Sequence, residues 1–213
     1  MNAETRLGFF AGLAAYCIWG SLPLYIRLMQ HIDAVDLLAH RVVWSVPTAL
    51  IFIGLAANWR DVRAALNWDK LKWLIVSGLL IGANWGCYIW AVNADRTMEA
   101  SLGYYINPLM FVAAGVFVFK EKLNRFQLFA VALAAAGVAV LTLGAGIFPW
   151  VSLVLAVTFT AYGYVRKMLD VGAMPGLFIE TVLLSPFAFA FLLWFSAAHG
   201  LAFGQGSMRI DLL

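Results

Sequence analysis

The sequence is poor in charged residues. Asp, Glu, Lys and Arg make up only 12% of its 213 residues, and hydrophobic residues make up 64%. An average soluble domain is about 25% charged, so this composition argues against a soluble enzyme, a disordered region, a disulfide-stapled domain or a nucleic-acid-binding module. The net charge of +3 does not indicate a nucleic-acid partner, because membrane proteins concentrate Lys and Arg in their cytoplasmic loops.

Residues of the usual metal-binding and catalytic chemistries are also scarce. Cys17 and Cys87 each lie within an apolar run, and the three histidines have no ligand spacing, so the sequence predicts neither a disulfide framework nor a metal site. It contains no G-x-x-x-x-G-K-[ST], H-E-x-x-H or G-x-S-x-G motif, the signatures of phosphate-binding loops, zinc proteases and serine hydrolases. We therefore expect no cofactor, no catalytic residues and no enzymatic activity.

Long apolar runs are abundant instead. A helix needs about 20 apolar residues to cross a bilayer core, and seven stretches qualify: residues 7–28, 35–55, 71–93, 98–119, 126–144, 148–165 and 176–196. Because a helix satisfies its own backbone hydrogen bonds in lipid, we predict an all-α integral membrane protein, a multi-span helical bundle. The connections are short, so successive helices should be antiparallel neighbours.

The distribution of Lys and Arg predicts the orientation of these spans. With the N-terminus in the cytoplasm, ten of the 14 basic residues lie in cytoplasmic segments. Arg96 and Arg209 lie outside, and Arg27 and Arg41 lie within spans. The positive-inside rule therefore favours a cytoplasmic N-terminus.

The sequence also contains an internal repeat. Residues 24–50 align without a gap on residues 163–189 at an offset of 139. The identical pairs include a Tyr-x-Arg at a span end and a mid-span proline: Tyr25/Tyr164, Arg27/Arg166, Leu38/Leu177, Val43/Val182, Pro47/Pro186 and Ala49/Ala188. The offset covers five spans, and an odd number turns the second copy upside down, as in the inverted repeats of many secondary transporters.

This arithmetic predicts the domain organisation. A first five-helix repeat fills residues 1–146, and residues 147–213 hold the first two spans of a truncated second repeat. We therefore expect seven spans of a ten-span architecture, with about three more beyond Leu213.

Two charged residues within spans are candidate functional residues. Arg41 shares one helical stripe with His40, Trp44, Ser45 and Thr48. An arginine within a span costs about 2.5–3.5 kcal/mol on insertion scales, so Arg41 should contact water, an anion or a carboxylate; the alternative is that it snorkels to the outer surface. Glu180, which the offset relates to Arg41, is a candidate for substrate or proton coupling, and the alternative is a solvated carboxylate near a helix start. The inversion argues against an ion pair between the two.

The third apolar run has two distinct faces. Gly78, Gly82 and Gly86 form small-xxx-small steps, which let another helix approach closely. Gly8 and Gly12 predict a second close-packing site. On the face opposite the three glycines, polar residues recur near helical spacing and should line a cavity or a helix contact: Ser77, Asn84 and Tyr88.

The fourth run combines aromatic hydroxyls with a proline. Pro108 frees a carbonyl about one turn back, near Tyr104, and Tyr105 and Asn107 lie beside it. We favour a substrate contact here; the alternative is a packed kink with tyrosines at the membrane interface.

Several short strings, in this order, carry a family resemblance: Trp19-Gly20, His40-Arg41-Val-Val-Trp44-Ser45, Gly82-Ala-Asn84-Trp85, Glu99-Ala-Ser101-Leu-Gly-Tyr104, Ile106-Asn107-Pro108, Lys120-Glu121-Lys122, Tyr162-Gly163-Tyr164-Val-Arg166-Lys167 and Ile179-Glu180-Thr181. The chain resembles the EamA family of the drug/metabolite transporter superfamily over nearly its whole length. The resemblance implies a ten-span transporter of the bacterial inner membrane, built from two inverted five-helix repeats around a central substrate cavity.

We therefore predict a secondary transporter that moves a small organic metabolite or drug by alternating access. The substrate pathway would be lined by Arg41, His40, Asn84, Tyr104, Tyr105, Asn107 and Glu180. The alternatives are a non-transporting membrane sensor or assembly subunit and a membrane-embedded enzyme acting on lipid-linked substrates. The expected partners are the small-molecule substrate and the lipid bilayer, with no nucleic acid; a homodimer is left open.

Overall fold

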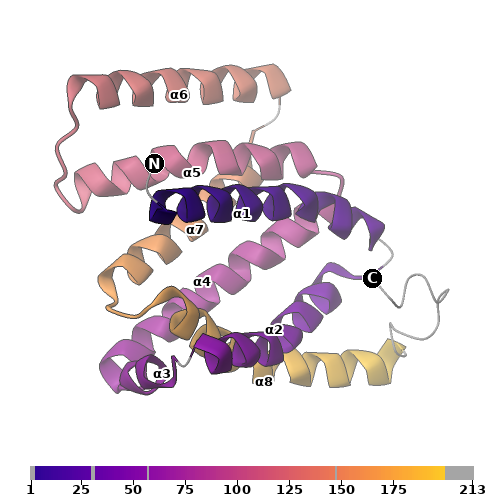
Figure 1. Cartoon of the computed structure of the whole chain (residues 1–213). Helices are drawn as coiled ribbons and strands as arrows, with labels where there is room; N and C mark the ends of the chain where they lie inside the picture. Colours follow the sequence, from indigo (N-terminus) through magenta and orange to yellow (C-terminus); the bar gives the residue numbers. More distant parts are fainter. Residues whose placement is uncertain (1–2, 30–31, 57, 147, 200–213) are drawn as a thin grey trace.

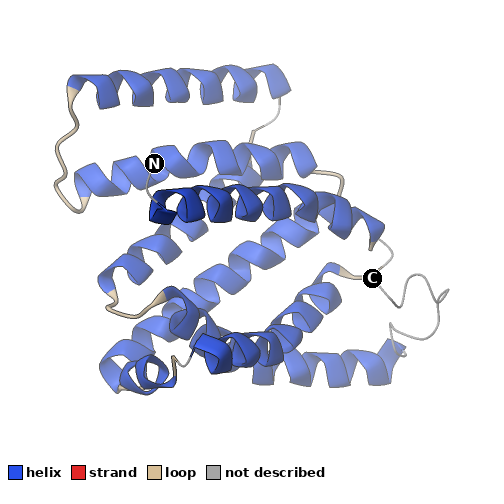
Figure 2. Ribbon diagram, viewed as in Figure 1, coloured by secondary structure: helices blue, strands red, loops and turns tan. Residues whose placement is uncertain are grey.

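The structure is a computed structural model that describes residues 3–29, 32–56, 58–146 and 148–199, and every regular element in these ranges is a helix (Figure 2). The helices are α1 (Ala3–Leu28), α2 (Ala34–Ala56), α3 (Trp59–Ala65), α4 (Trp68–Asn93), α5 (Thr97–Phe117), α6 (Arg125–Ala145), α7 (Trp150–Met168) and α8 (Ala173–His199). Six of them, α1, α2, α4, α5, α6 and α8, contain a stretch long and apolar enough to cross a membrane. The predicted all-helical class is confirmed.

The helix bounds differ from the predicted spans in two places. The helix predicted over residues 148–165 is present as α7, but it is not among the six membrane-crossing candidates of the described chain. Arg166 and Lys167 in its last turn lower its mean hydropathy. The seven-residue α3 was not predicted, because its sequence Trp-Arg-Asp-Val-Arg-Ala-Ala is too short and too charged to stand out as a span.

Polar residues at the helix ends explain where several helices start and stop. The Asn67 side chain accepts a hydrogen bond from the Lys70 amide and caps α4. Asn124 and Gln127 form a reciprocal capping box at the start of α6, which satisfies backbone N–H groups that have no partner within the helix. Gly146 ends α6 in the left-handed conformation with φ of 64°, which glycine adopts without a steric penalty.

Helix α4 lies at the centre of the arrangement (Figure 1). It packs against α7 along much of its length and also contacts α8, α2, α1 and α5. Helices α2 and α8 pack together on one side of α4, whereas α5 packs against α7 on the other side and α6 lies beyond α5. The fold therefore joins an α2–α8 pair and an α5–α7 pair through α4.

Two apolar clusters anchor the two ends of α4. Near its start, Leu74 packs with Ile53, Val62, Ala65 and Ile179 from α2, α3 and α8. Near its end, the cluster contains Ile26, Tyr88, Ile89, Ala91, Val92, Ala100, Val151 and Leu155. The middle of α4 carries the polar residues that approach its neighbours, so the packing fixes both ends of the helix and leaves specific polar contacts between them.

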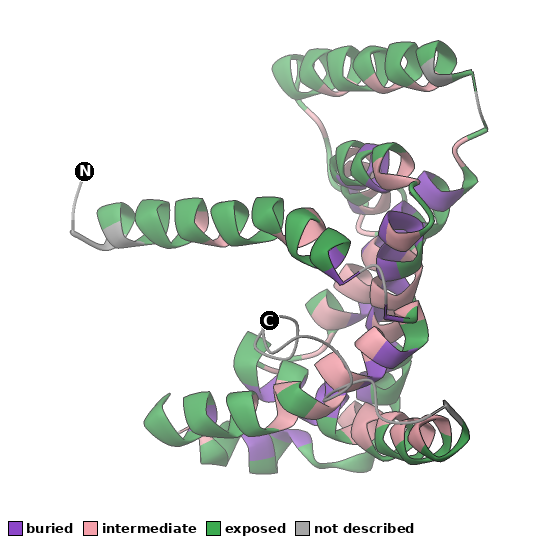
Figure 3. Ribbon diagram, turned by 90° about the vertical axis from the view of Figure 1, so that its right-hand side faces the viewer, coloured by how far each residue is buried: buried purple, intermediate pink, exposed green. Residues whose placement is uncertain are grey.

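Helices α1 and α6 stand apart from this packing (Figure 3). Only 6% of the membrane-crossing stretch of α1 and none of that of α6 is buried, which suits apolar faces that contact lipid. No described residue packs closely at Gly8 or Gly12, where a Cβ atom would meet nothing within 4 Å, so the close-packing site there stays a prediction. A small-xxx-small pattern permits close approach but does not supply the partner helix.

Candidate functional site

A groove of about 740 Å³ runs along one face of α2. The α2 side chains that line it are spaced as on a single helical stripe: Leu37, His40, Arg41, Trp44, Ser45, Thr48, Ala49 and Phe52. The rest of the lining comes from α1 and the turn after it, from α4 and from the start of α8: Leu22, Tyr25, Ile26, Met29, Ile32, Ile89, Met174 and Leu177. We call this the α2 groove; its volume is within the range of about 300–1,000 Å³ typical of small-molecule pockets.

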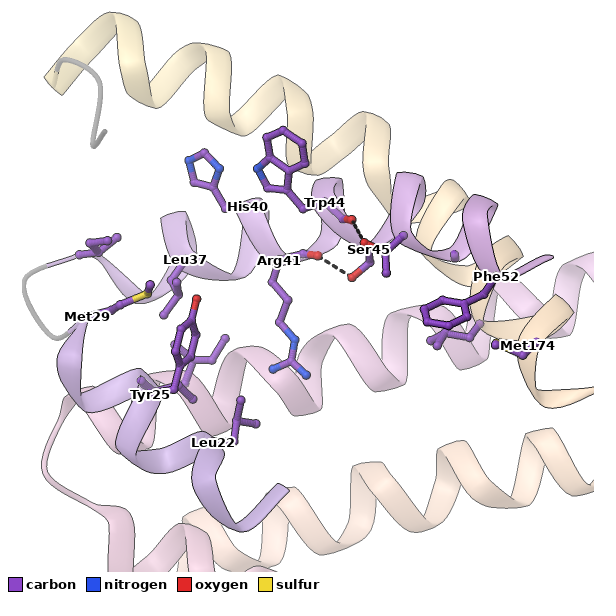
Figure 4. A pocket seen from close by; sticks show the side chains of 16 residues that line it. Leu22, Tyr25, Met29, Leu37, His40, Arg41, Trp44, Ser45, Phe52 and Met174 are labelled. Carbon is purple, nitrogen blue, oxygen red and sulfur yellow. Dashed lines mark hydrogen bonds between the residues drawn. The ribbon is translucent and has the colours of Figure 1, made fainter. Parts of the chain in front are cut away.

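Arg41 is the cationic side chain of this groove. Figure 4 shows Arg41 extending from α2 towards the side where Tyr25 and Leu22 lie, whereas His40 and Trp44 leave the same stripe in another direction. The Arg41 guanidinium carbon lies 4.5 Å from the centroid of the Trp85 ring on α4, a cation–π distance. The half-buried guanidinium thus extends across the protein, towards α4.

The hydroxyl groups of the groove bond to α2 itself. Ser45 Oγ donates to the Arg41 carbonyl at 2.6 Å, and Thr48 Oγ1 donates to the Trp44 carbonyl at 2.9 Å (Figure 4). These bonds use the hydroxyl protons within the helix. The two hydroxyl oxygens therefore present acceptors to the groove.

A second polar cluster lies away from the groove, between α4, α7 and α8. Glu180 is only 1% exposed, and its Oε1 accepts a hydrogen bond from Ser77 Oγ at 2.5 Å and lies 3.7 Å from Arg166 Nη1. Tyr162 donates to Oε2 at 3.4 Å. Glu180 is therefore buried, and the alternative of a solvated carboxylate is wrong.

Glycines make room for this cluster. A Cβ atom at Gly176 would overlap the Arg166 guanidinium, so the arginine lies directly against the α8 backbone. Arg166 Nη2 also donates to the Gly172 carbonyl at 3.0 Å, and a Cβ at Gly78 would lie 3.6 Å from Glu180 Cβ. The start of α8 is therefore held against α4 and α7 by one connected set of contacts.

The three glycines of α4 face two different helices. Gly78 and Gly82 lie against α8, where the Cβ of the second would be 3.3 Å from Leu184 Cδ1. Gly86 lies against α2, with its Cβ position 3.1 Å from Leu38 Cδ2. The line of glycines on α4 thus faces both members of the α2–α8 pair.

The two asparagines predicted to line the pathway lie outside the groove lining. Asn84 Nδ2 donates to the Leu155 carbonyl at 2.9 Å and to Thr158 Oγ1 at 2.8 Å. Asn107 is buried in α5, and its Oδ1 has no hydrogen-bond partner among the described residues. Of the two alternatives for Asn84, a cavity or a helix contact, the structure shows the helix contact.

The two tyrosines of α5 differ in their surroundings. The Tyr104 ring packs edge-on against Tyr88, with 5.7 Å between ring centroids, and both lie close enough to Arg41 to interact with its charge. Tyr105 is exposed. Of the predicted pathway residues, the structure brings His40 and Arg41 into the groove and Tyr104 near it, and it places the others elsewhere in the described chain.

The described residues hold no group of three His, Cys, Asp or Glu side chains at one point that could bind a metal ion. The nearest approach to such chemistry in the groove is His40, whose Nε2 lies 3.8 Å from the buried Asp36 carboxylate. That pair joins two residues one turn apart on α2.

The sequence analysis missed the partner of Glu180. Arg166 entered that analysis only as a repeat match and as part of a family string, although it directly follows the predicted span over residues 148–165 that precedes Glu180. A buried carboxylate requires a counter-charge, so Arg166 could have been selected on that ground. Tyr25 and Leu177 were selected only as repeat matches, and Met174 lines the groove without a sequence signal that distinguishes it from other apolar residues.

Comparison with known proteins places the chain in a family. The model of the EamA-like transporter family matches residues 6–143. The chain belongs to the EamA-like transporter family. Together with its apolar helices, this membership identifies it as a multi-pass membrane protein.

Curated relatives of this EamA-family chain are similar over most of its length. An uncharacterised transporter of Pseudomonas aeruginosa is 48% identical over 198 residues, which cover 92% of this chain and 66% of the relative. Proteins named RarD from Streptomyces exfoliatus and Escherichia coli are 42% and 39% identical, covering 92% and 99% of this chain and 65% and 71% of the relative. The chain thus spans about two thirds of the length of these relatives. No solved structure matches it significantly.

Proposed function

We propose that this EamA-family chain acts in secondary transport and carries a small organic solute along the α2 groove by alternating access. The observation that carries the proposal is the continuous lining of one α2 face from Leu37 to Phe52. That segment rises about 22 Å at 1.5 Å per residue, and a bilayer core is about 30 Å thick. A solute in the groove would therefore have contacts over most of the membrane thickness.

Helix α8 is the element we assign to the movement. Met174 and Leu177 at its start line the groove, and Glu180, less than one turn further on, belongs to the cluster with Ser77 and Arg166. A displacement of α8 would therefore change the groove and the Glu180 contacts together. We propose that Glu180 couples this movement to the binding of a proton or another cation, and that Asn84 and Asn107 support the pathway by positioning α7.

We propose a topology for the chain as well. The N-terminus is cytoplasmic, the membrane is the bacterial inner membrane, and α7 crosses it as the sixth of seven spans, because its 19 residues rise about 28 Å and its polar side chains face neighbouring helices. Residues 1–146 form one five-helix repeat, and residues 147–213 begin an inverted second repeat. We assign the exposed faces of α1 and α6 to lipid, with a homodimer through these faces as the alternative.

Site-directed tags at Arg60 and Lys122 test this topology. Both tags should report the cytoplasmic face, because an even number of proposed spans separates them. Accessibility from opposite faces would contradict the inverted repeat.

Transport itself is tested in proteoliposomes with a panel of radiolabelled organic solutes. We expect at least one solute to cross faster than in protein-free vesicles. Ala49→Phe, which fills the groove, should abolish this flux, and Ile51→Phe, on an exposed part of α2 outside the groove, should retain it. A solute that binds but is not moved would favour the sensor alternative, and equal flux in both variants would show that the pathway lies elsewhere.

A further inference from the structure

We infer that the α2 groove is a binding site for small organic anions and that Arg41 holds the anionic group. This inference deepens the proposed function, because it names the class of solute that the groove would carry. Binding can be measured without transport, so the two proposals are tested separately.

The charged side chains of the groove lining favour an anionic solute. Among the described residues, the lining includes the Arg41 guanidinium and no Asp or Glu side chain. The acidic residue of α2, Asp36, is buried outside the lining and lies beside His40. A solute in the groove would therefore meet a positive charge without a competing carboxylate, and a cationic solute would be repelled.

The guanidinium of Arg41 has hydrogen-bond donors that the described residues do not use. Among the described residues, its guanidinium has no ion pair and no hydrogen-bond acceptor. Trp85 covers a face of the guanidinium group, but the N–H donors of an arginine lie in the plane of the group and point from its edges. These donors stay available, and their planar fork matches a carboxylate or a phosphate.

Three other arginines of the described chain have a carboxylate partner that Arg41 lacks. Arg27 pairs with Asp95, Arg96 with Glu99, and Arg166 with Glu180. Arg41 is half-buried within a membrane-crossing helix, where an unsatisfied charge is costly. An anionic ligand would supply the partner that the described protein groups do not.

The remainder of the lining defines the body of the ligand. Apart from Arg41, His40, Ser45 and Thr48, the groove is lined by aliphatic and aromatic side chains such as Tyr25, Trp44 and Phe52. Ser45 and Thr48 present acceptor oxygens, which offer little to an anion. The geometry thus selects one anionic group at Arg41 attached to an apolar or aromatic body.

Three probes with the same body and different charge test this inference: 4-phenylbutyrate, 4-phenylbutyramide and 4-phenylbutylamine. Their binding to the purified protein in phosphatidylcholine nanodiscs is measured by isothermal titration calorimetry. We expect the anion to bind at least about tenfold more tightly than the amide and the amine, since only the anion accepts hydrogen bonds from Arg41 that are strengthened by opposite charges. Arg41→Gln should remove this preference, Arg41→Lys should retain part of it, and Arg27→Gln, at the exposed end of α1, should leave it unchanged.

Equal binding of the three probes to the wild type, or a preference that persists in Arg41→Gln, would overturn the inference, and the wild-type comparison holds even if a variant fails to fold. Loss of 4-phenylbutyrate binding when the nanodiscs contain phosphatidylglycerol would assign Arg41 to a lipid phosphate and would also overturn it. If anion binding depends on Arg41 but no solute crosses in proteoliposomes, the inference is supported and transport is contradicted. If solutes cross but the groove shows no preference for anions, transport is supported and the inference is contradicted.

Discussion

Arg41 and Glu180 are related by the 139-residue offset, yet the structure surrounds their charges in opposite ways. Glu180 is buried among Ser77, Tyr162 and Arg166, whereas Arg41 lies on the Trp85 ring and faces a groove without a carboxylate. A charge whose partners all come from the protein contributes to the fold. A charge with open donors is available to a ligand.

The charges at the positions related by this offset differ in sign. The offset relates Arg166 to Arg27, so residues 24–50 carry two cations where residues 163–189 carry a cation and a carboxylate. Arg27 and Arg41 cannot pair, and Arg27 instead donates to Asp95 at 3.4 Å. We interpret this difference in sign as the reason why Arg41 lacks the ion pair that Glu180 forms, and the predictions below test this comparison.

The largest expected effect is that of Glu180→Ala. Removal of one partner leaves Arg166 uncompensated, which typically destabilises a protein by about 3–5 kcal/mol. The free energy of unfolding in mixed micelles, followed by tryptophan fluorescence during SDS titration, measures it. Glu121→Ala breaks an exposed pair with Lys167 and should cost no more than about 1 kcal/mol. Similar values for the two variants would show that the Glu180 cluster does not stabilise the fold.

A smaller effect is expected from Gly176→Ala. The added methyl group would overlap the Arg166 guanidinium and force it away from Glu180, and overpacking of this kind costs about 1–3 kcal/mol. The matched control is Gly137→Ala in α6, where a Cβ atom meets nothing within 4 Å; it should be neutral or slightly stabilising. If Gly176→Ala is as stable as this control, Arg166 does not require contact with the α8 backbone.

Asn84→Ala should have a smaller effect again. It removes two hydrogen bonds from α4 to α7, and interhelical hydrogen bonds in membranes average about 0.6 kcal/mol, with a maximum near 1.7. A double-mutant cycle with Thr158→Ala measures the coupling between the two side chains. Zero coupling would argue against this contact, and a value near that of Glu180 would extend the structural cluster along α4.

Much of the fold could be predicted from the sequence, because membrane helices follow from long apolar runs. The run over residues 71–93, for example, became α4 over Trp68–Asn93. The short α3 could not be predicted in this way, since Val62 and Ala65 become core residues only through contact with α2, α4 and α8. Local hydropathy carries no information about such tertiary contacts.

The candidate site was predicted to a lesser extent. Helical spacing placed His40, Arg41 and Ser45 on one stripe, and these residues do line the groove. Spacing alone could not decide whether Asn84 faces a cavity or a helix, because both environments accept a polar side chain. That choice depends on the position of α7, which brings the Leu155 carbonyl within 2.9 Å of the amide.

The smallest expected effect on stability is that of Arg41→Leu, and it provides the sharpest test of the comparison. The substitution removes a cation–π contact with Trp85, worth about 0.5–2 kcal/mol. It also removes a charge that is costly to hold within a membrane-crossing helix. The two terms oppose each other, so the free energy of unfolding should stay the same or rise slightly, while the preference for 4-phenylbutyrate is lost. If Arg41→Leu instead destabilises the protein as much as Glu180→Ala, then Arg41 holds the fold together as Glu180 does. The groove would then have no open charge to offer a solute.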